Sequence, residues 1–310
     1  MTIKELIVNI RVKNIRGEVE QAVTAIHFDS RKVVPGSVFV AVKGRATDGH
    51  MFIDKAVDRG AVCVITEENV DHISEHVCVL TVENSAEVLA KIAGAFYDYP
   101  SRNLTMVGVT GTNGKTTVAT LLFRLFTELG YKCGLLSTIE NRIGDEVEPT
   151  GYTTPDAVAV QETLARMIEA GCTHAFMEVS SHALDQHRVD GIAWDVAIFT
   201  NITHDHLDYH GDFKTYIQAK KIFFDGLSAQ AFALINADDK HAEVMVQNTV
   251  AKVSNYSLTK IADFRARVIE NRIDGLQLEV NGIPLHVRLV GKFNASNLLA
   301  IYGAALLLGE

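Results

Sequence analysis

Residues 108–117, GVTGTNGKTT, follow an apolar run and combine three glycines with one lysine and several threonines. Glycines let backbone amides approach a ligand closely, and a turn between a strand and a helix aims N–H groups and the helix dipole at an anion. Lys115 would supply positive charge toward the outer phosphates, and the Thr116 hydroxyl could reach magnesium. We therefore expect a polyphosphate site formed by Gly111, Thr112, Asn113, Gly114, Lys115, Thr116 and Thr117.

The spacing of this loop is G-x-x-G-x-x-G-K-T. It departs from the strict G-x-x-x-x-G-K-[ST] pattern because Val109 occupies the first glycine position. The alternative is an ordinary turn that contains Gly-Lys-Thr by chance. A strand pattern before the loop and a helix pattern after it favour the phosphate-binding interpretation.

Acidic and imidazole side chains follow two further strand patterns. Glu178 closes THAFMEV, and DVAIFT runs into NITHDHLDYHGD. Hard cations take oxygen ligands and sometimes imidazole, so the second segment is a candidate metal site, with a solvated polar loop as the alternative. The polar side chains in that segment are Asn201, His204, Asp205, His206, Asp208 and His210.

Lys220 lies on an apolar helical stripe in KTYIQAKKIFFDGL. The stripe follows i, i+3, i+4 spacing and comprises Tyr216, Ala219, Lys220, Phe223 and Leu227. A lysine in such surroundings needs a partner or a chemical change, or it extends its ammonium group to solvent.

The 310 residues suggest two domains. SVFVAVKG (37–44), a helical segment ending at Gly60, and AVCVIT (61–66) predict a β-α-β unit, and a further helix over 84–97 precedes Pro100. Residues 1–100 are therefore expected to form a small α/β domain.

Between 101 and 310, short β-branched runs alternate with helices over about 115–129 and 156–170, which predicts a doubly wound, mostly parallel sheet. Asp274-Gly275 and Asn281-Gly282 then indicate an antiparallel β meander before a closing apolar helix.

Composition excludes several classes of protein. The apolar fraction is 47% and the formal net charge is −9, so no broad positive field is available for nucleic acid or an anionic membrane surface. The amino terminus lacks the apolar run of a signal peptide, and no segment has the length of a membrane span. The four cysteines are widely spaced in the sequence and fit buried thiols in a reducing compartment. We expect a cytoplasmic protein.

Four motifs in this order resemble the ATP-dependent Mur ligases of peptidoglycan synthesis, in particular the MurE type: TGTNGKTT, MEVSSHALDQHR, TNITHDHLDYHG and GKFNASN. The resemblance implies an amino-terminal domain for a uridine nucleotide and a central phosphate-loop ATPase domain. A carboxyl-terminal domain that binds the incoming amino acid would lie beyond residue 310. We therefore expect this chain to be a fragment that is inactive alone. We also expect it to be a monomer.

The resemblance also implies site roles. Lys115 would be the phosphate-loop lysine and Thr116 a magnesium ligand, with Glu178 and His206 as further metal ligands. Lys220 would be carbamylated and complete a site for two Mg²⁺ ions, and Asn294 would contact the adenine of ATP. The implied contacts to the nucleotide-sugar substrate are Ser30, Arg45, Ala46, Thr47, Thr153, Thr154, Ser180, Gln186 and Arg188.

The implied reaction joins an amino acid to UDP-N-acetylmuramoyl-L-alanyl-D-glutamate through an acyl phosphate formed with ATP. The incoming diamino acid would be meso-diaminopimelate, favoured here, or L-lysine. One alternative is a folylpolyglutamate-synthetase-like ligase, which shares the loop but not the first domain. The other is a non-catalytic module that binds the nucleotide or the precursor.

Overall fold

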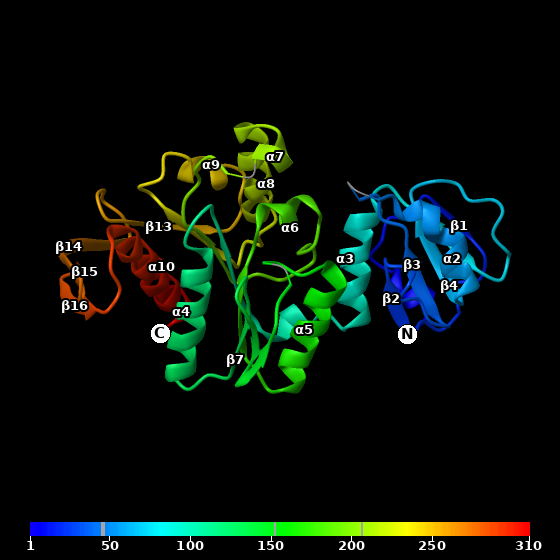
Figure 1. The fold of residues 1–310 in the computed structure, drawn as a ribbon, viewed down its shortest axis with the longest axis horizontal. Coiled ribbons are helices and arrows are strands. Elements are labelled where there is room, and N and C mark those ends of the chain that lie inside the picture. Colours follow the sequence, from blue (N-terminus) through cyan, green and yellow to red (C-terminus); the bar gives the residue numbers. More distant parts are fainter. Residues whose placement is uncertain (45–46, 152, 206) are drawn as a thin grey trace. The chain divides into compact units, whose positions relative to one another are not determined.

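A computed structural model describes residues 1–44, 47–151, 153–205 and 207–310 (Figure 1). The chain forms two compact units. Unit 1 comprises residues 1–100, 156–165 and 186–192, and unit 2 comprises residues 101–155, 166–185 and 193–310. Two short segments from the second half of the chain thus belong to unit 1.

Unit 1 is built on a five-stranded sheet in which β2 to β5 run parallel and β1 pairs antiparallel with β5. The strand order is β1 (Asn14–Arg16), β5 (Cys78–Thr81), β4 (Ala61–Thr66), β3 (Ser37–Val40) and β2 (Ala25–His27). The helices of this unit are α1 (Ile3–Leu6), the 3₁₀ turn η1 (Gly49–Phe52), α2 (Ile53–Asp58) and α3 (Ser85–Phe96).

Both faces of this sheet are covered. Val38 and Val40 pack into one core with α1 and α3, whereas Phe39 packs into the opposite core with α2. This division follows from the strand period of two, which sends successive side chains to opposite faces. The β-α-β unit expected over 37–66 is present, although its single predicted helix is divided into η1 and α2.

The four cysteines are buried free thiols. Cys63 and Cys78, which are 15 positions apart in the sequence, lie directly opposite each other on the neighbouring strands β4 and β5. Burial raises the pKa of the Cys63 thiol. Sequence spacing could not reveal this pair, because register between parallel strands is set by the sheet and not by distance along the chain.

Unit 2 contains an eleven-stranded sheet whose centre is parallel and whose two ends are antiparallel. The order is β16 (Ile283–Val287), β15 (Gly275–Val280), β14 (Phe264–Arg272), β13 (Lys252–Ser257), β12 (Phe232–Asn236), β11 (Val196–Phe199), β6 (Thr105–Thr110), β10 (His174–Glu178), β7 (Cys133–Leu136), β8 (Asn141–Ile143) and β9 (Glu146–Glu148). The doubly wound α/β sheet with an antiparallel meander is therefore confirmed. The β8–β9 hairpin and the parallel strand β13 were not expected.

Two long helices of residues 101–310 lie close to the positions expected for them, 115–129 and 156–170. The helices of unit 2 are α4 (Lys115–Glu128), α6 (Ser181–Asp185), α7 (Leu207–His210), α8 (Phe213–Asp225), α9 (Ala242–Met245) and α10 (Lys292–Leu308), and the short 3₁₀ turn η2 (Pro100–Asn103) precedes β6. The first nine residues of α5 (Ala157–Glu169) belong to unit 1 and its last four to unit 2. Leu227, expected on the same helical stripe as Lys220, lies beyond the end of α8.

Alternation along β6 decides which helix covers which face of the sheet. Val107 and Val109 belong to the core formed with α4 and α10, which run side by side in Figure 1. Gly108 points the other way, because a Cβ atom there would lie 2.5 Å from Phe223 of α8 and 2.8 Å from Trp194. The strand end before the phosphate loop is thus enclosed by α4 on one face and α8 on the other.

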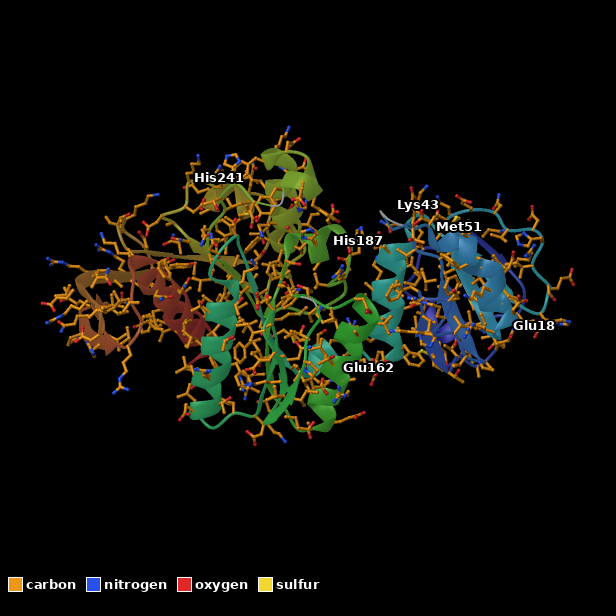
Figure 2. All side chains as sticks on the ribbon, in the orientation of Figure 1. Glu18, Lys43, Met51, Glu162, His187 and His241 are labelled. Atoms are coloured by element: carbon orange, nitrogen blue, oxygen red, sulfur yellow. The ribbon has the colours of Figure 1, made fainter. Side chains whose placement is uncertain are left out.

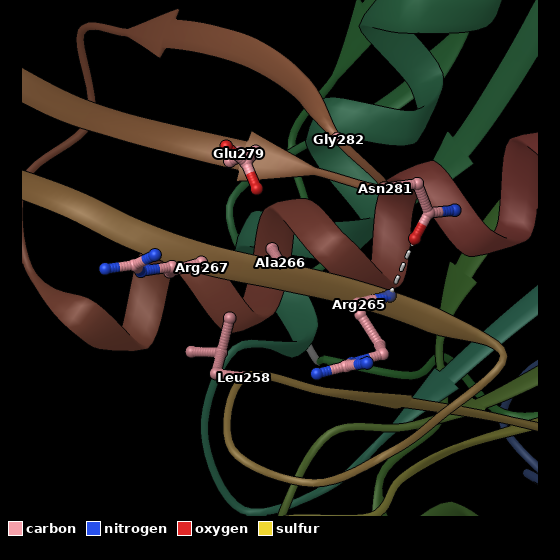
Figure 3. Close-up of a pocket in the computed structure, with 7 residues that line it drawn as sticks. All are labelled: Leu258, Arg265, Ala266, Arg267, Glu279, Asn281 and Gly282. Atoms are coloured by element: carbon pink, nitrogen blue, oxygen red, sulfur yellow. Dashed lines mark hydrogen bonds between the residues drawn. The ribbon is translucent and has the colours of Figure 1, made fainter.

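The meander turn at Asn281 and Gly282 confirms the hairpin signal. Both residues have positive φ, +48° and +85°, as a two-residue type I′ turn requires. Asn281 Oδ1 also accepts a hydrogen bond of 3.2 Å from the backbone N–H of Arg265, drawn in Figure 3. The open cavity in that figure is lined by residues of β14, β15 and the adjoining turns, and none of the predicted site residues lines it.

Within the described ranges, no helix combines the length and the apolar character needed to cross a bilayer.

Candidate nucleotide and metal site

The loop between β6 and α4 has the backbone conformation that its glycines predict. Gly111 and Gly114 adopt φ values of +149° and +89°, and Gly114 caps the amino terminus of α4. A Cβ atom on Gly111 would lie 1.9 Å from the Thr200 hydroxyl, and one on Gly114 would lie 2.5 Å from Asn297 Oδ1. Neither position could accept a side chain without displacing a neighbouring element.

Residues after β11 hold this loop from one side. The Thr200 hydroxyl donates to the Asn113 carbonyl at 2.6 Å, and the Asn201 amide both donates to that carbonyl and accepts from the Asn113 N–H, each at 3.0 Å. Thr112 is fixed in the same way, since its N–H donates to the Asn201 carbonyl at 2.8 Å. The loop is therefore fixed by neighbouring residues of the protein.

Two lysines converge on one carbonyl oxygen of the loop. Lys115 Nζ and Lys220 Nζ each lie 2.9 Å from the Gly111 carbonyl oxygen, so the two nitrogens lie within twice that distance of each other. Lys220 is 1% exposed. Burial, and then the charge of Lys115, lower the pKa of Lys220 well below its usual value, while Asp205 opposes the shift. Burial also lowers the pKa of Lys115, against the carboxylates of Glu178 and Asp205.

Glu178 lies at the end of β10, beside the loop. Its buried carboxylate accepts hydrogen bonds from the Thr116 hydroxyl at 2.9 Å, the Thr138 N–H at 2.7 Å and the Thr138 hydroxyl at 3.1 Å. β6, β7 and β10 are parallel neighbours, so their carboxyl ends meet at this edge. Ligands on doubly wound sheets bind beyond that edge.

The donor set at this edge fits a magnesium ion that is shared with a nucleotide. Mg²⁺ keeps several waters and takes one or two protein oxygens together with substrate phosphates, and the hydroxyl of Thr116 and the carboxylate of Glu178 are adjacent oxygens of that kind. No group of three or more His, Cys, Asp or Glu residues that could hold a metal occurs in the described part of the chain.

The predicted substrate contacts in unit 2 are connected to Glu178. The Thr154 hydroxyl donates to the Glu178 carbonyl at 2.9 Å and lies 3.4 Å from the Ser180 hydroxyl. The Thr153 hydroxyl lies 3.1 Å from the Thr138 hydroxyl and donates to it, since the Thr138 proton is directed to the Glu178 carboxylate. These three predicted contacts therefore adjoin Glu178 and Thr138.

Asn294 lies in the first turn of α10. Its amide nitrogen donates to the Val290 carbonyl at 2.8 Å, and its Oδ1 accepts from Asn297 at 3.2 Å. Asn297 packs against Gly114, so α10 connects Asn294 to the start of α4.

In unit 1, the other predicted substrate contacts lie in turns. Ser30 is buried after β2, and the Thr47 carbonyl accepts from the Gly44 N–H at 3.0 Å. Arg188 donates to Gln186 Oε1 through Nε at 3.1 Å and through Nη2 at 2.6 Å. Arg45, Ala46 and His206 lie outside the described residues.

The histidines around residue 206 make other contacts. His204 stacks on Phe213 with ring centres 4.4 Å apart, and Nε2 of the buried His210 lies 3.0 Å from the Ser181 hydroxyl. His210 thus joins α7 to α6, and His204 packs against the first residue of α8.

Sequence reasoning missed three residues that hold the loop or Glu178, namely Thr138, Thr200 and Asn297. Thr138 and Thr200 each follow a parallel strand that ends at the same edge as Glu178. The rule that predicted Glu178 would therefore have found both. Asn297 carried no comparable signal, because its role depends on how α10 packs on α4.

Comparison with known proteins agrees with this geometry. The description "Mur ligase middle domain" matches residues 109–305, and "Mur ligase family, catalytic domain" matches residues 22–97. The chain belongs to the Mur ligase family. A relative from Cytophaga hutchinsonii, named UDP-N-acetylmuramoyl-L-alanyl-D-glutamate–2,6-diaminopimelate ligase, is 54% identical over 100% of this chain and 64% of its own length. A relative of the same name from Phocaeicola vulgatus is 49% identical over the same shares.

Solved structures show the same fold. A UDP-N-acetylmuramoyl-L-alanyl-D-glutamate–2,6-diaminopimelate ligase superposes with a TM-score of 0.84 at 28% identity, over 100% of this chain and 64% of that one. The Mycobacterium tuberculosis folylpolyglutamate synthase complexed with ADP and AMPPCP superposes with a TM-score of 0.54 at 19% identity, over 70% of this chain and 57% of that one. The present chain thus spans about two thirds of the length of these Mur ligase relatives.

Proposed function

We propose that this protein is an ATP-dependent ligase that adds 2,6-diaminopimelate to UDP-N-acetylmuramoyl-L-alanyl-D-glutamate. The observation that carries the proposal is the convergence of Lys115, Thr116, Glu178 and Lys220 on one loop at the carboxyl edge of the sheet. The names of the relatives supply the substrates.

The proposed reaction has two steps. The D-glutamyl side-chain carboxylate attacks the γ-phosphorus of ATP, the bond to the β-phosphate oxygen breaks, and an acyl phosphate and ADP result. The diamino acid's amine then attacks the acyl carbon, phosphate leaves with the bonding electrons, and the amine loses a proton as the amide forms. Lys115 and the backbone amides of the loop would stabilise negative charge on the transferring phosphoryl group.

Magnesium would be held by Thr116 and Glu178, with His206 as a further proposed ligand, and when bound it neutralises charge on the phosphate oxygens. Thr138 would keep the Glu178 carboxylate directed at the loop through its two hydrogen bonds. Asn294, which reaches the loop through Asn297, is the proposed contact for adenine.

We further propose that Lys220 is carbamylated. A neutral amine attacks CO₂ to form a carbamate and releases one proton. The modification would replace the lysine cation by an anionic group whose oxygen could bind a second Mg²⁺ ion. The supporting observations are the burial of Lys220 and the nearby charge of Lys115, both of which favour the neutral amine.

The nucleotide-sugar substrate would be bound by Ser30, Arg45, Ala46, Thr47, Thr153, Thr154, Ser180, Gln186 and Arg188. The hydrogen bonds that join Thr153, Thr154 and Ser180 to the surroundings of Glu178 support a place for its peptide end near the phosphates. We place the protein in the cytoplasm as a monomer; four buried free thiols suit a reducing compartment.

The test is ADP release in protein extended to the full length of the relatives. Release should require UDP-N-acetylmuramoyl-L-alanyl-D-glutamate, Mg²⁺ and diaminopimelate together, with L-lysine as the competing amine. Release driven by a folate and glutamate would favour the folylpolyglutamate-synthetase alternative. Nucleotide binding without any release would favour a non-catalytic module.

A further inference from the structure

The amino-terminal end of α3 makes polar contacts that the proposed reaction does not use. Asn84 caps the helix, because its Oδ1 accepts hydrogen bonds from the N–H groups of Ala86 at 3.0 Å and Glu87 at 3.1 Å. That use of Oδ1 fixes the orientation of the amide, so Nδ2 points away from the helix as a donor.

Nδ2 of Asn84 lies 3.1 Å from His187 Nε2. Since Nδ2 can only donate, Nε2 must accept and carries no proton. The imidazole proton is then on Nδ1, which donates to Asp190 Oδ2 at 2.7 Å. His187, labelled in Figure 2, is therefore held as one tautomer between α3 and its own turn.

His187 has a φ of +56°, which costs free energy in a residue with a side chain. It separates Gln186 from Arg188, the two proposed substrate contacts whose side chains are hydrogen bonded to each other. The contacts of His187 with Asn84 and Asp190 offset that cost and hold the turn in the conformation that presents this pair.

A second chain of contacts starts one residue further along α3. Glu67 Oε1 accepts from the N–H and the hydroxyl of Ser85, each at 2.8 Å, and the Glu67 N–H donates to His50 Nε2 at 3.1 Å. Nε2 is thus unprotonated here too. His50 Nδ1 donates to Asp48 Oδ1 at 2.6 Å, and the backbone of Asp48, the residue after Thr47, forms an antiparallel β-bridge with Lys43.

We propose that the amino-terminal end of α3 positions both substrate-binding segments of unit 1, so that Asn84, His187, Glu67 and His50 determine affinity for the nucleotide-sugar substrate without touching it. The inference rests on the proposed function, which supplies the substrate. The contacts of residues 48–50 and of residues 187–190, which are far apart in the sequence, lead through separate histidines to the adjacent residues Asn84 and Ser85, which supports a shared anchor.

The decisive variant is Asn84→Ser. Serine is a good helix cap, so α3 keeps its capping residue while the donor to His187 is lost. Titration calorimetry with UDP-N-acetylmuramoyl-L-alanyl-D-glutamate should show binding roughly 3- to 10-fold weaker, the effect of one neutral hydrogen bond. Affinity for a magnesium-bound, nonhydrolysable ATP analogue and the melting temperature should not change. Lys91→Ala, which removes an exposed ion pair on the same helix, is the matched control.

Two further variants test the histidines. His187→Gly keeps a residue that tolerates positive φ and removes the imidazole, and His50→Phe keeps a ring and removes both hydrogen bonds. Each should weaken the nucleotide-sugar substrate selectively, as Asn84→Ser does. If Asn84→Ser has a lower melting temperature than the wild type, its affinity does not separate lost positioning from lost stability. The substrate affinity of His187→Gly then decides whether the inference holds.

Unchanged substrate affinity in both Asn84→Ser and His187→Gly would overturn the inference. An equal loss of affinity for the substrate and the ATP analogue would also overturn it, because that pattern indicates general destabilisation. If the wild-type chain does not bind the nucleotide-sugar substrate at all, the proposed function fails instead.

Discussion

At the scale of single residues, the meeting of Lys115 and Lys220 on the Gly111 carbonyl is the most informative contact. Sequence predicted Lys115 from its motif and placed Lys220 on an apolar stripe. It could not show that both reach one oxygen, because they belong to elements on opposite faces of the sheet. A buried amine beside a cation is costly in its charged form, which supports the proposed carbamylation of Lys220.

Lys220→Ala should therefore lose ligase activity, by roughly 100-fold or more if the carbamate completes the electrostatic environment of the transferring phosphoryl group. Short carboxylic acids such as formate or acetate should partly restore the rate by occupying the place of the carbamate. ADP release as a function of carboxylate concentration measures the effect.

The matched control is Lys221→Ala on the same helix. Lys221 is also buried but pairs with Asp225 at 2.5 Å, so this variant should lower stability and show no carboxylate rescue. Full activity of Lys220→Ala without added carboxylate would exclude the carbamate.

At the scale of elements, β6 is the strand that positions the site. Its alternation places Val107 and Val109 under α4 and α10 and leaves Gly108 beneath Phe223 and Trp194, which lets α8 approach closely enough for Lys220 to reach the loop. The strand, loop and helix were predictable from period and glycine spacing. The need for glycine at position 108 was not, because only the packing of α8 reveals it.

Gly108→Ala should destabilise the folded protein by about 1–3 kcal/mol, the usual cost of forcing an extra methyl group into a packed interior. Gly151→Ala is the control, because no heavy atom lies within 4 Å of the added methyl group, and the stability of that variant should not change. Urea unfolding of the two variants and the wild type measures the differences in the free energy of unfolding. Equal stability of the two variants would show that α8 does not press on β6 as described.

At the scale of the whole molecule, sequence predicted the α/β class, the doubly wound sheet, the meander and the loop at the sheet edge. It could not assign residues 156–165 and 186–192 to unit 1, because their helical and polar patterns say nothing about which sheet they join. The antiparallel hairpin β8–β9 was also missed, since its strands are only three residues long and one has no buried face. The meeting of Lys115, Thr116 and Glu178 could be predicted because parallel strands bring their carboxyl ends, and the residues after them, to one edge.

The most direct measurement is calorimetric titration of the chain with a nonhydrolysable ATP analogue, with and without Mg²⁺. Wild-type protein and the Lys214→Ala variant, which alters an exposed lysine on α8, should bind equally. Lys115→Ala should bind at least roughly 10-fold more weakly, as expected for the loss of a charged hydrogen bond, and chelation of Mg²⁺ should weaken wild-type binding. Equal affinity in Lys115→Ala, or binding that does not depend on Mg²⁺, would contradict a triphosphate site at this loop.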